Sequence, residues 1–182
     1  MKQFSHYKMT SEYDGSKLVS GYFYNDDQEA AIEDGSLVVV GDVVNHSVFT
    51  GMLDFDNRKV TYPTATTDKV AVVDYVGVAE GAIAGNIYRE GIKTAGLTCP
   101  AGRPTRVRVL EAGDTFFTAS GNFDTTPAKG KYAIPTANAG IWTVVNEASD
   151  TETCIKIEGS KPLTQGTVDA DTLYFCTVVN AL

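Results

Sequence analysis

The chain has 182 residues, of which 43% are hydrophobic and 21% charged, and its formal net charge is −8. A domain of this size buries roughly 70% of the surface that its unfolded chain exposes, so it can fold without disulfides or metals. The composition excludes a collagen, a disordered chain and a disulfide scaffold. The acidic balance opposes binding to nucleic acid, and no apolar run is long enough to span a bilayer. Because residues 1–7 lack the apolar segment of a secretory signal, we expect a soluble protein made inside a cell.

The first 30 residues are aromatic but contain no long apolar run. Their aromatic side chains are Phe4, Tyr7, Tyr13, Tyr22, Phe23 and Tyr24. Aromatic residues offer a large contact area at low entropic cost, so residues 1–30 are interpreted as an extended arm that lies across a partner. The alternative is that this segment completes a sheet of the chain itself. Only Asp26–Ile32 has the pattern of a helix, of one or two turns, with acids at its start.

Short strands are predicted for the rest of the chain. Two valine-rich runs, 37–44 and 70–78, have apolar residues on both faces, as strands buried between two layers do. Further strands are predicted near residues 48–53, 59–62, 92–98, 105–109, 114–118, 131–134, 141–145, 154–158 and 172–179. Glycine-containing turns separate these segments. The pattern predicts an all-β fold over residues 31–182, an antiparallel β-barrel or β-sandwich with very little helix. If it has two subdomains, we expect the break near residues 111–114.

Two of these strands alternate between apolar and charged residues. In Cys154–Glu158 the isoleucines are expected to face a core and the charged residues to face water. In Thr105–Val109 the valines and arginines are expected on opposite faces. Three arginines, Arg103, Arg106 and Arg108, form a basic cluster in an acidic chain. We interpret the cluster either as a contact surface for an acidic partner or as a solvated face with weak local ion pairs.

No arrangement of chemically active residues is recognisable in the sequence. His6 lies in the terminal segment and His46 in a turn, and no nucleophile motif accompanies either one. Asp54–Asn57 and Asp169–Asp171 have the spacing of weak calcium loops, but we interpret them as solvated turns. Cys99, Cys154 and Cys176 lack a C-x-x-C spacing, so we expect three reduced, partly buried thiols. The sequence therefore predicts no catalytic residue, metal or cofactor, and a protein that is not an enzyme.

Several segments carry a resemblance to a known class of proteins. An acidic-glycine turn precedes a valine strand in Glu33–Asp42, and Thr61–Asp68 is rich in threonine and contains a proline. Leu97–Pro104 and Val107–Phe116 follow further along the chain. Over roughly residues 30–125, this chain resembles structural proteins of tailed-bacteriophage virions, most nearly the head decoration (capsid cement) proteins.

The resemblance implies a protein that binds the major capsid protein on the outer surface of the capsid and stabilises the lattice. It implies a homo-oligomer, a trimer or a dimer, made in the cytoplasm of a bacterial host and located on the virion. An extended terminal arm would pair with strands of the capsid protein. Two alternatives stay open: a tail-tube protein, and a carbohydrate-binding or host-adhesion β-sandwich that stacks sugars on Tyr132, Trp142 and Tyr174. For Trp142, burial in the core is the expected placement.

Overall fold

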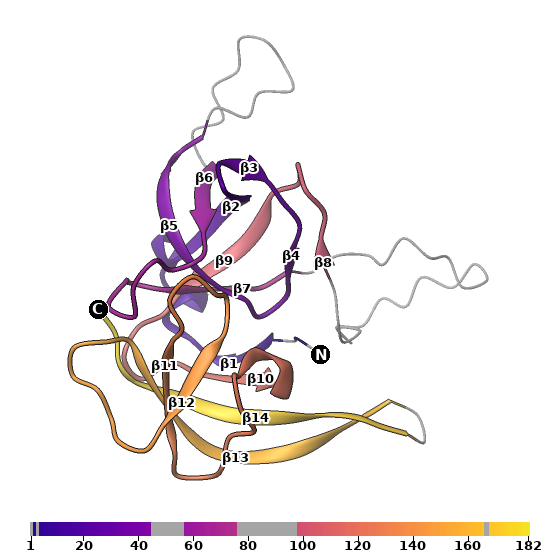
Figure 1. The fold of residues 1–182 in the computed structure, drawn as a ribbon, viewed down its shortest axis with the longest axis vertical. Coiled ribbons are helices and arrows are strands. Elements are labelled where there is room, and N and C mark those ends of the chain that lie inside the picture. The colour runs from indigo at the N-terminus through magenta and orange to yellow at the C-terminus, as the bar shows by residue number, and fades with distance from the viewer. Residues whose placement is uncertain (1, 3, 45–56, 76–97, 166–167) are drawn as a thin grey trace.

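The structure is a computed structural model that describes residue 2 and residues 4–44, 57–75, 98–165 and 168–182. It is all-β, with two main sheets that lie one above the other in Figure 1. The predicted fold class is confirmed, and one of the sheets is closed into a β-barrel. Within the described residues, no helix is long and apolar enough to cross a membrane.

The barrel has five strands and closes without a free edge. Its strands follow the order β2-β6-β5-β7-β9, and β9 pairs with β2 to complete the ring. The β2–β6 pair is parallel and the other pairs are antiparallel. Two short pairings, β2–β3 and β4–β8, are attached to it. The bounds are β2 Leu18–Asn25, β3 Gln28–Glu29, β4 Ile32–Glu33, β5 Leu37–Val43, β6 Asn57–Thr61, β7 Ala71–Val73, β8 Thr98–Cys99 and β9 Thr105–Val109.

The second sheet, called the open sheet here, has six antiparallel strands in the order β1-β10-β14-β13-β11-β12. Its bounds are β1 Phe4–Lys8, β10 Thr115–Ala119, β11 Tyr132–Pro135, β12 Trp142–Val145, β13 Cys154–Gln165 and β14 Val168–Asn180. Strands β13 and β14 form a long ribbon that extends past the other strands (Figure 1). Three short 3-10 turns complete the elements: η1 Thr10–Glu12, η2 Gly15–Lys17 and η3 Ser120–Asn122.

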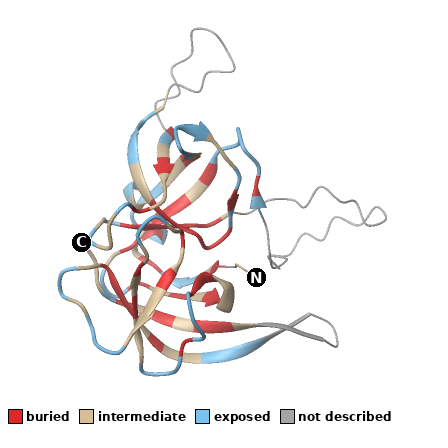
Figure 2. Cartoon of the chain, viewed as in Figure 1, coloured by how far each residue is buried: buried red, intermediate tan, exposed pale blue. Residues whose placement is uncertain are grey.

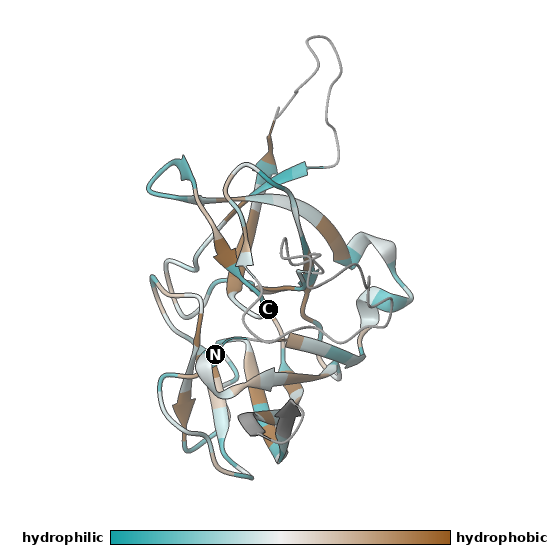
Figure 3. Cartoon of the chain, turned by 90° about the vertical axis from the view of Figure 1, so that its right-hand side faces the viewer, coloured by the Kyte–Doolittle hydropathy of each residue, from teal (hydrophilic) through white to brown (hydrophobic). Residues whose placement is uncertain are grey.

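Two hydrophobic cores result, because β5 and β7 lie between them. Leu37 and Val72 face the open sheet, whereas the adjacent Val38 and Ala71 face the inside of the barrel. This confirms the prediction that both valine-rich runs contain strands with apolar residues on both faces. In Figure 2 the buried residues gather inside the barrel and between it and the open sheet. Figure 3 shows that the hydrophobic residues concentrate on the strands.

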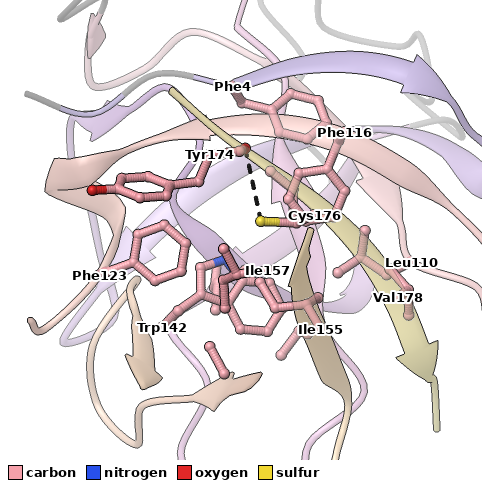
Figure 4. Close-up of a cluster of buried hydrophobic side chains, with 14 of the residues drawn as sticks. Phe4, Leu110, Phe116, Phe123, Trp142, Ile155, Ile157, Tyr174, Cys176 and Val178 are labelled. Atoms are coloured by element: carbon pink, nitrogen blue, oxygen red, sulfur yellow. Dashed lines mark hydrogen bonds between the residues drawn. The ribbon is translucent and has the colours of Figure 1, made fainter. Parts of the chain in front are cut away.

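The core beneath the open sheet contains the largest side chains. Trp142 is 1% exposed, and Phe4 packs on Phe116 with ring centroids 5.3 Å apart (Figure 4). Ile155 and Ile157 point into the same core, as their alternation predicts. The burial of Trp142 is the expected placement.

Residues 4–25 are built into both sheets. β1 pairs with β10 at the edge of the open sheet, and β2 is a strand of the barrel. Asp114, 2% exposed, fixes the connection between them: it accepts hydrogen bonds from the backbone N–H of Thr10 at 2.6 Å, the hydroxyl of Thr10 at 2.8 Å and the N–H of Glu111 at 3.0 Å. The chain also passes from the barrel to the open sheet at residues 110–114. Of the two interpretations of the N-terminal segment, the structure shows the one in which it completes the chain's own sheets.

A carboxylate residue contacts the backbone of each edge strand of the open sheet. At the β1 edge, Asp34 accepts the N–H of Phe4 and the N–H of Tyr75, each at 2.9 Å. At the β12 edge, Asp124 donates its N–H to the carbonyl of Trp142 and accepts the N–H of Val144 with its side chain. Such caps protect an edge strand from pairing with another chain. Each edge strand is therefore partly capped by the chain itself.

The helical turn predicted at Asp26–Ile32 is wrong, because this segment contains a tight hairpin. Asn25 pairs with Gln28, which leaves Asp26 and Asp27 as a two-residue loop with φ of 50° and 62°. Positive φ at both central residues is the signature of a type I′ turn, which matches the twist of the flanking strands. The predicted strand at 48–53 and most of that at 92–98 lie outside the described residues.

Candidate functional site

Three aromatic rings form a cluster on the outer face of the open sheet. Tyr7, Phe117 and Phe175 come from β1, β10 and β14, and their ring centroids are 5.0–6.2 Å apart. The neighbours Phe116 and Cys176 point into the core, so the cluster lies on the opposite side of the sheet. Tyr7 is 66% exposed, whereas Phe117 and Phe175 are half-buried. The arrangement presents a contiguous aromatic surface to solvent.

A lysine and a valine extend this aromatic cluster. The Nζ atom of Lys161, on β13, lies 4.2 Å from the ring centroid of Phe117, a cation–π contact. Val179 on β14 lies four residues after Phe175, on the same face, and is 41% exposed. Exposed apolar clusters with a polar rim are typical of protein contact sites.

A second cluster, which is polar, joins the N-terminal segment to the barrel. The buried carboxylate of Asp74 receives the Nη2 atom of Arg106 at 2.8 Å and the Nε atom of Arg108 at 2.7 Å, both on Oδ2. The Nη1 atom of Arg108 lies 2.9 Å from the Oγ atom of Ser11. Because a buried carboxylate is costly without partners, this pairing explains why two arginines converge on Asp74.

His6 brings this cluster close to the composition of a catalytic triad, but its geometry is different. The Nδ1 atom of His6 lies 3.9 Å from Asp74, and its Nε2 atom lies 3.2 Å from the carboxylate of Glu12. In a triad, the serine hydroxyl is hydrogen-bonded to the histidine. Here Ser11 is 4% exposed, and its hydroxyl contacts Arg108. The arrangement is that of a structural junction between β1, η1, β7 and β9.

An open cavity of about 480 Å³ lies beside this junction. Its lining includes Leu18, Ser20, Tyr75, Pro104 and Arg106. The hydroxyl of Ser20 donates to Asn57 at 2.7 Å, and Arg106 pairs with Asp74. The Ser20 hydroxyl and the Nη2 atom of Arg106 are thus engaged within the chain. Among the described residues, no three His, Cys, Asp or Glu side chains come together to hold a metal ion.

The predicted arm residues separate into core and surface positions. Phe4, Tyr22 and Phe23 are at most 6% exposed, packed by the chain's own strands, so this conformation offers none of them to a partner. The structure thereby corrects their assignment as contact residues. Tyr24 is half-buried, with its hydroxyl 3.2 Å from Glu29. Tyr7 and Tyr13 remain as exposed aromatic residues, and only Tyr7 belongs to the aromatic cluster.

The predicted basic cluster also divides. Arg103 is exposed, Arg106 is half-buried, and Arg108 is 5% exposed. Arg108 fits neither interpretation, a contact surface or a solvated face, because it forms a buried ion pair with Asp74, the residue after β7. Sequence periodicity identified the shared face of the arginines but could not identify Asp74 as their partner.

Two other sets of predicted residues are placed in the interior. Trp142 and Tyr174 are at most 6% exposed, so they cannot stack a sugar, and Tyr132 is half-buried. Cys99, Cys154 and Cys176 are free thiols, buried more fully than expected, and burial raises the pKa of each thiol above its ordinary value. His46, Asp54 and Asp56 lie outside the described residues, as do the side chains of Asp169 and Asp171.

The sequence analysis missed Phe117, Phe175 and Lys161. A signal for the first two is present in the sequence, since Phe116–Phe117 and Tyr174–Phe175 are adjacent aromatic pairs within strands. Successive strand residues point to opposite faces, so one ring of each pair must leave the core. Comparison of the chain with protein-family models, with curated proteins and with solved structures gave no match.

Proposed function

We propose that this chain is a non-enzymatic structural protein of a tailed-bacteriophage virion, which binds the major capsid protein and stabilises the outer surface of the capsid. The observation that carries the proposal is the aromatic cluster of Tyr7, Phe117 and Phe175 on the outer face of the open sheet. Exposed aromatic groups on a rigid framework favour adhesion to another surface. The resemblance of residues 30–125 to head decoration proteins supplies the identity of that surface.

This proposal differs from the arm model in its mode of contact. In the arm model, residues 1–30 would enter the sheet of the capsid protein as an extra strand. In the structure their strands pair within the chain, and release of β1 would expose Phe4 and part of the core. A preformed face binds without that cost, because little chain must be ordered or detached.

Co-sedimentation with expanded, empty heads tests the proposal. We expect the wild-type chain to pellet with the heads up to a fixed copy number and to raise the temperature at which the heads break. The variant Tyr7→Ser is expected to bind weakly. The matched control is Tyr13→Ser, since Tyr13 is 82% exposed but lies at the end of η1, outside the aromatic cluster. A wild-type chain that stays in the supernatant contradicts the proposal.

A tail-tube protein is a second candidate, favoured by one observation. In the described part of the chain, residues 162–165 of β13 pair only with residues 168–172 of β14, and this end of the ribbon extends from the body (Figure 1). A projecting hairpin is what ring formation between copies of a tube protein requires. Electron microscopy of the concentrated chain tests this candidate: tubes or stacked rings support it, and dispersed particles count against it.

A further inference from the structure

The strand register places the residues that surround the aromatic cluster on the outer face of β1, β10, β14 and β13. Across β10, β14 and β13 the central row is Phe117, Phe175 and Gly159. The rows on either side follow from the same register: Lys8, Thr115, Thr177 and Lys156 on one side, and Ala119, Leu173 and Lys161 on the other. The face therefore has an aromatic centre on β10 and β14, and its charged residues lie on the flanking strands β1 and β13.

The side chains described on this face carry a net charge opposite in sign to that of the chain as a whole. Among the outward residues whose side chains the structure describes, the cations are Lys8, Lys156 and Lys161, and the acid is Glu158, 3.3 Å from Lys156. Three lysines and one glutamate give a local charge of +2, whereas the chain carries −8. The remaining residues must then sum to −10. A positively charged rim on an acidic protein favours an orientation in which this face approaches a negatively charged surface.

Gly159 leaves the aromatic centre open on one side. It is the residue opposite Phe175, and a Cβ atom added there would meet nothing within 4 Å. A longer residue at this position would stand next to the Phe175 ring. With glycine, residue 159 places no side chain beside this ring, and the open space at that position has room for a side chain of a partner.

We infer that the outer face of the open sheet binds a protein surface that has an apolar centre and a carboxylate-rich rim. This inference rests on the proposed function, and it assigns that surface to the capsid subunit. Charge complementarity sets the orientation and the rate of association, and the aromatic centre supplies the contact that excludes water. A second copy of the same face is a poor occupant, because the two lysine rims would repel each other.

Binding to heads by four single variants tests the inference. Gly159→Glu places an acid at the aromatic centre, and its matched control is Gly15→Glu, where an added Cβ also meets nothing within 4 Å and which lies in η2. Lys161→Glu reverses a rim charge, and its matched control is Lys129→Glu, an exposed lysine outside the face. We expect the two face variants to lose about tenfold or more in affinity and the two controls to stay within about twofold of the wild type. Buried Trp142 reports by its fluorescence that each variant is folded.

Salt dependence and self-association complete the experiment. Raising the ionic strength from about 0.05 M to about 0.5 M is expected to weaken the binding of the wild type by about tenfold. If the wild type binds heads but all four variants bind equally, another surface makes the contact: the proposed function stands and the inference is overturned. If the wild type does not bind heads, both fail. Concentration-dependent self-association that Gly159→Glu abolishes would identify a second copy as the occupant and would also overturn the inference.

Discussion

Replacement of Asp114 by alanine tests how the N-terminal segment is held. This one carboxylate fastens Thr10 to the connection at which the chain leaves the barrel for the open sheet. Alanine would remove the acceptor of three hydrogen bonds, two of them from backbone N–H groups. We expect β1 and η1 to loosen, and the core around Phe4 and Met9 to lose packing as a result.

The magnitude of this effect follows from the three contacts. A hydrogen bond to a charged group contributes about 1.5–3 kcal/mol, and water can replace part of it where the site is half-buried. Thr10 is half-buried and Asp114 is 2% exposed. We therefore expect Asp114→Ala to lower the free energy of unfolding by roughly 3 kcal/mol. Asp114→Asn keeps one carbonyl oxygen but turns an amino group toward an N–H donor, so we expect a loss of roughly 2 kcal/mol.

Urea unfolding followed by the fluorescence of Trp142, the single tryptophan, measures both losses. Its indole is buried in the core beneath the open sheet and becomes exposed on unfolding. The control is Asp42→Ala, an exposed acid on β5, which should change the free energy of unfolding by less than about 0.5 kcal/mol. An Asp114→Ala variant as stable as this control would refute the reasoning.

Three further predictions concern packing, thiols and pH. Gly21→Ala would place a Cβ atom 2.7 Å from Val60 Cγ1 and 3.1 Å from the carbonyl of Arg58, so we expect urea unfolding to show a free energy of unfolding lower by about 1–3 kcal/mol. The control Gly159→Ala has open space around the added Cβ and should be nearly neutral. Equal stability of the two variants would contradict this prediction. Burial raises the pKa of Cys99, Cys154 and Cys176, so alkylation near about pH 8 should be slow in the native chain and should reach all three thiols in denaturant. Rapid alkylation of the native chain would contradict this prediction. The hydrogen bond from Lys17 lowers the pKa of Glu111 below its ordinary 4.5, so its contribution to stability is present above that pH and is lost as the pH falls through the lowered pKa. Glu111→Gln should therefore be less stable than the wild type at neutral pH and should approach it in acid, and a deficit that is the same at both pH values would contradict the assignment.

Local patterns in the sequence predicted most of the described strands after residue 36, because a strand pattern depends on neighbouring residues, but they did not predict β1 to β4. The alternation of Ile155 and Ile157 and the apolar faces of β5 and β7 all match the structure. The class of fold follows from many such segments with little helix between them. Closure of the barrel by β2 and β9 was not predictable, since it pairs segments about 85 residues apart.

The candidate site depended on contacts between distant segments, and most of it could not be predicted. The strand pattern predicts that Arg108 faces away from the core, and only the fold shows that Asp74 lies beside it. The aromatic N-terminal segment was predicted to be an extended arm that includes Phe4. Only the pairing of β1 with β10 shows that Phe4 is a core residue. The adjacent pairs Phe116–Phe117 and Tyr174–Phe175 are the exception, because strand geometry alone requires one ring of each pair to face outward.

Cryo-electron microscopy of the intact virion tests the central claim most directly. The account predicts density for a small barrel joined to a six-stranded sheet on the outside of the head, with Tyr7, Phe117 and Phe175 turned toward the capsid subunits. A head surface without this density, or one on which these three rings point to solvent, would contradict it.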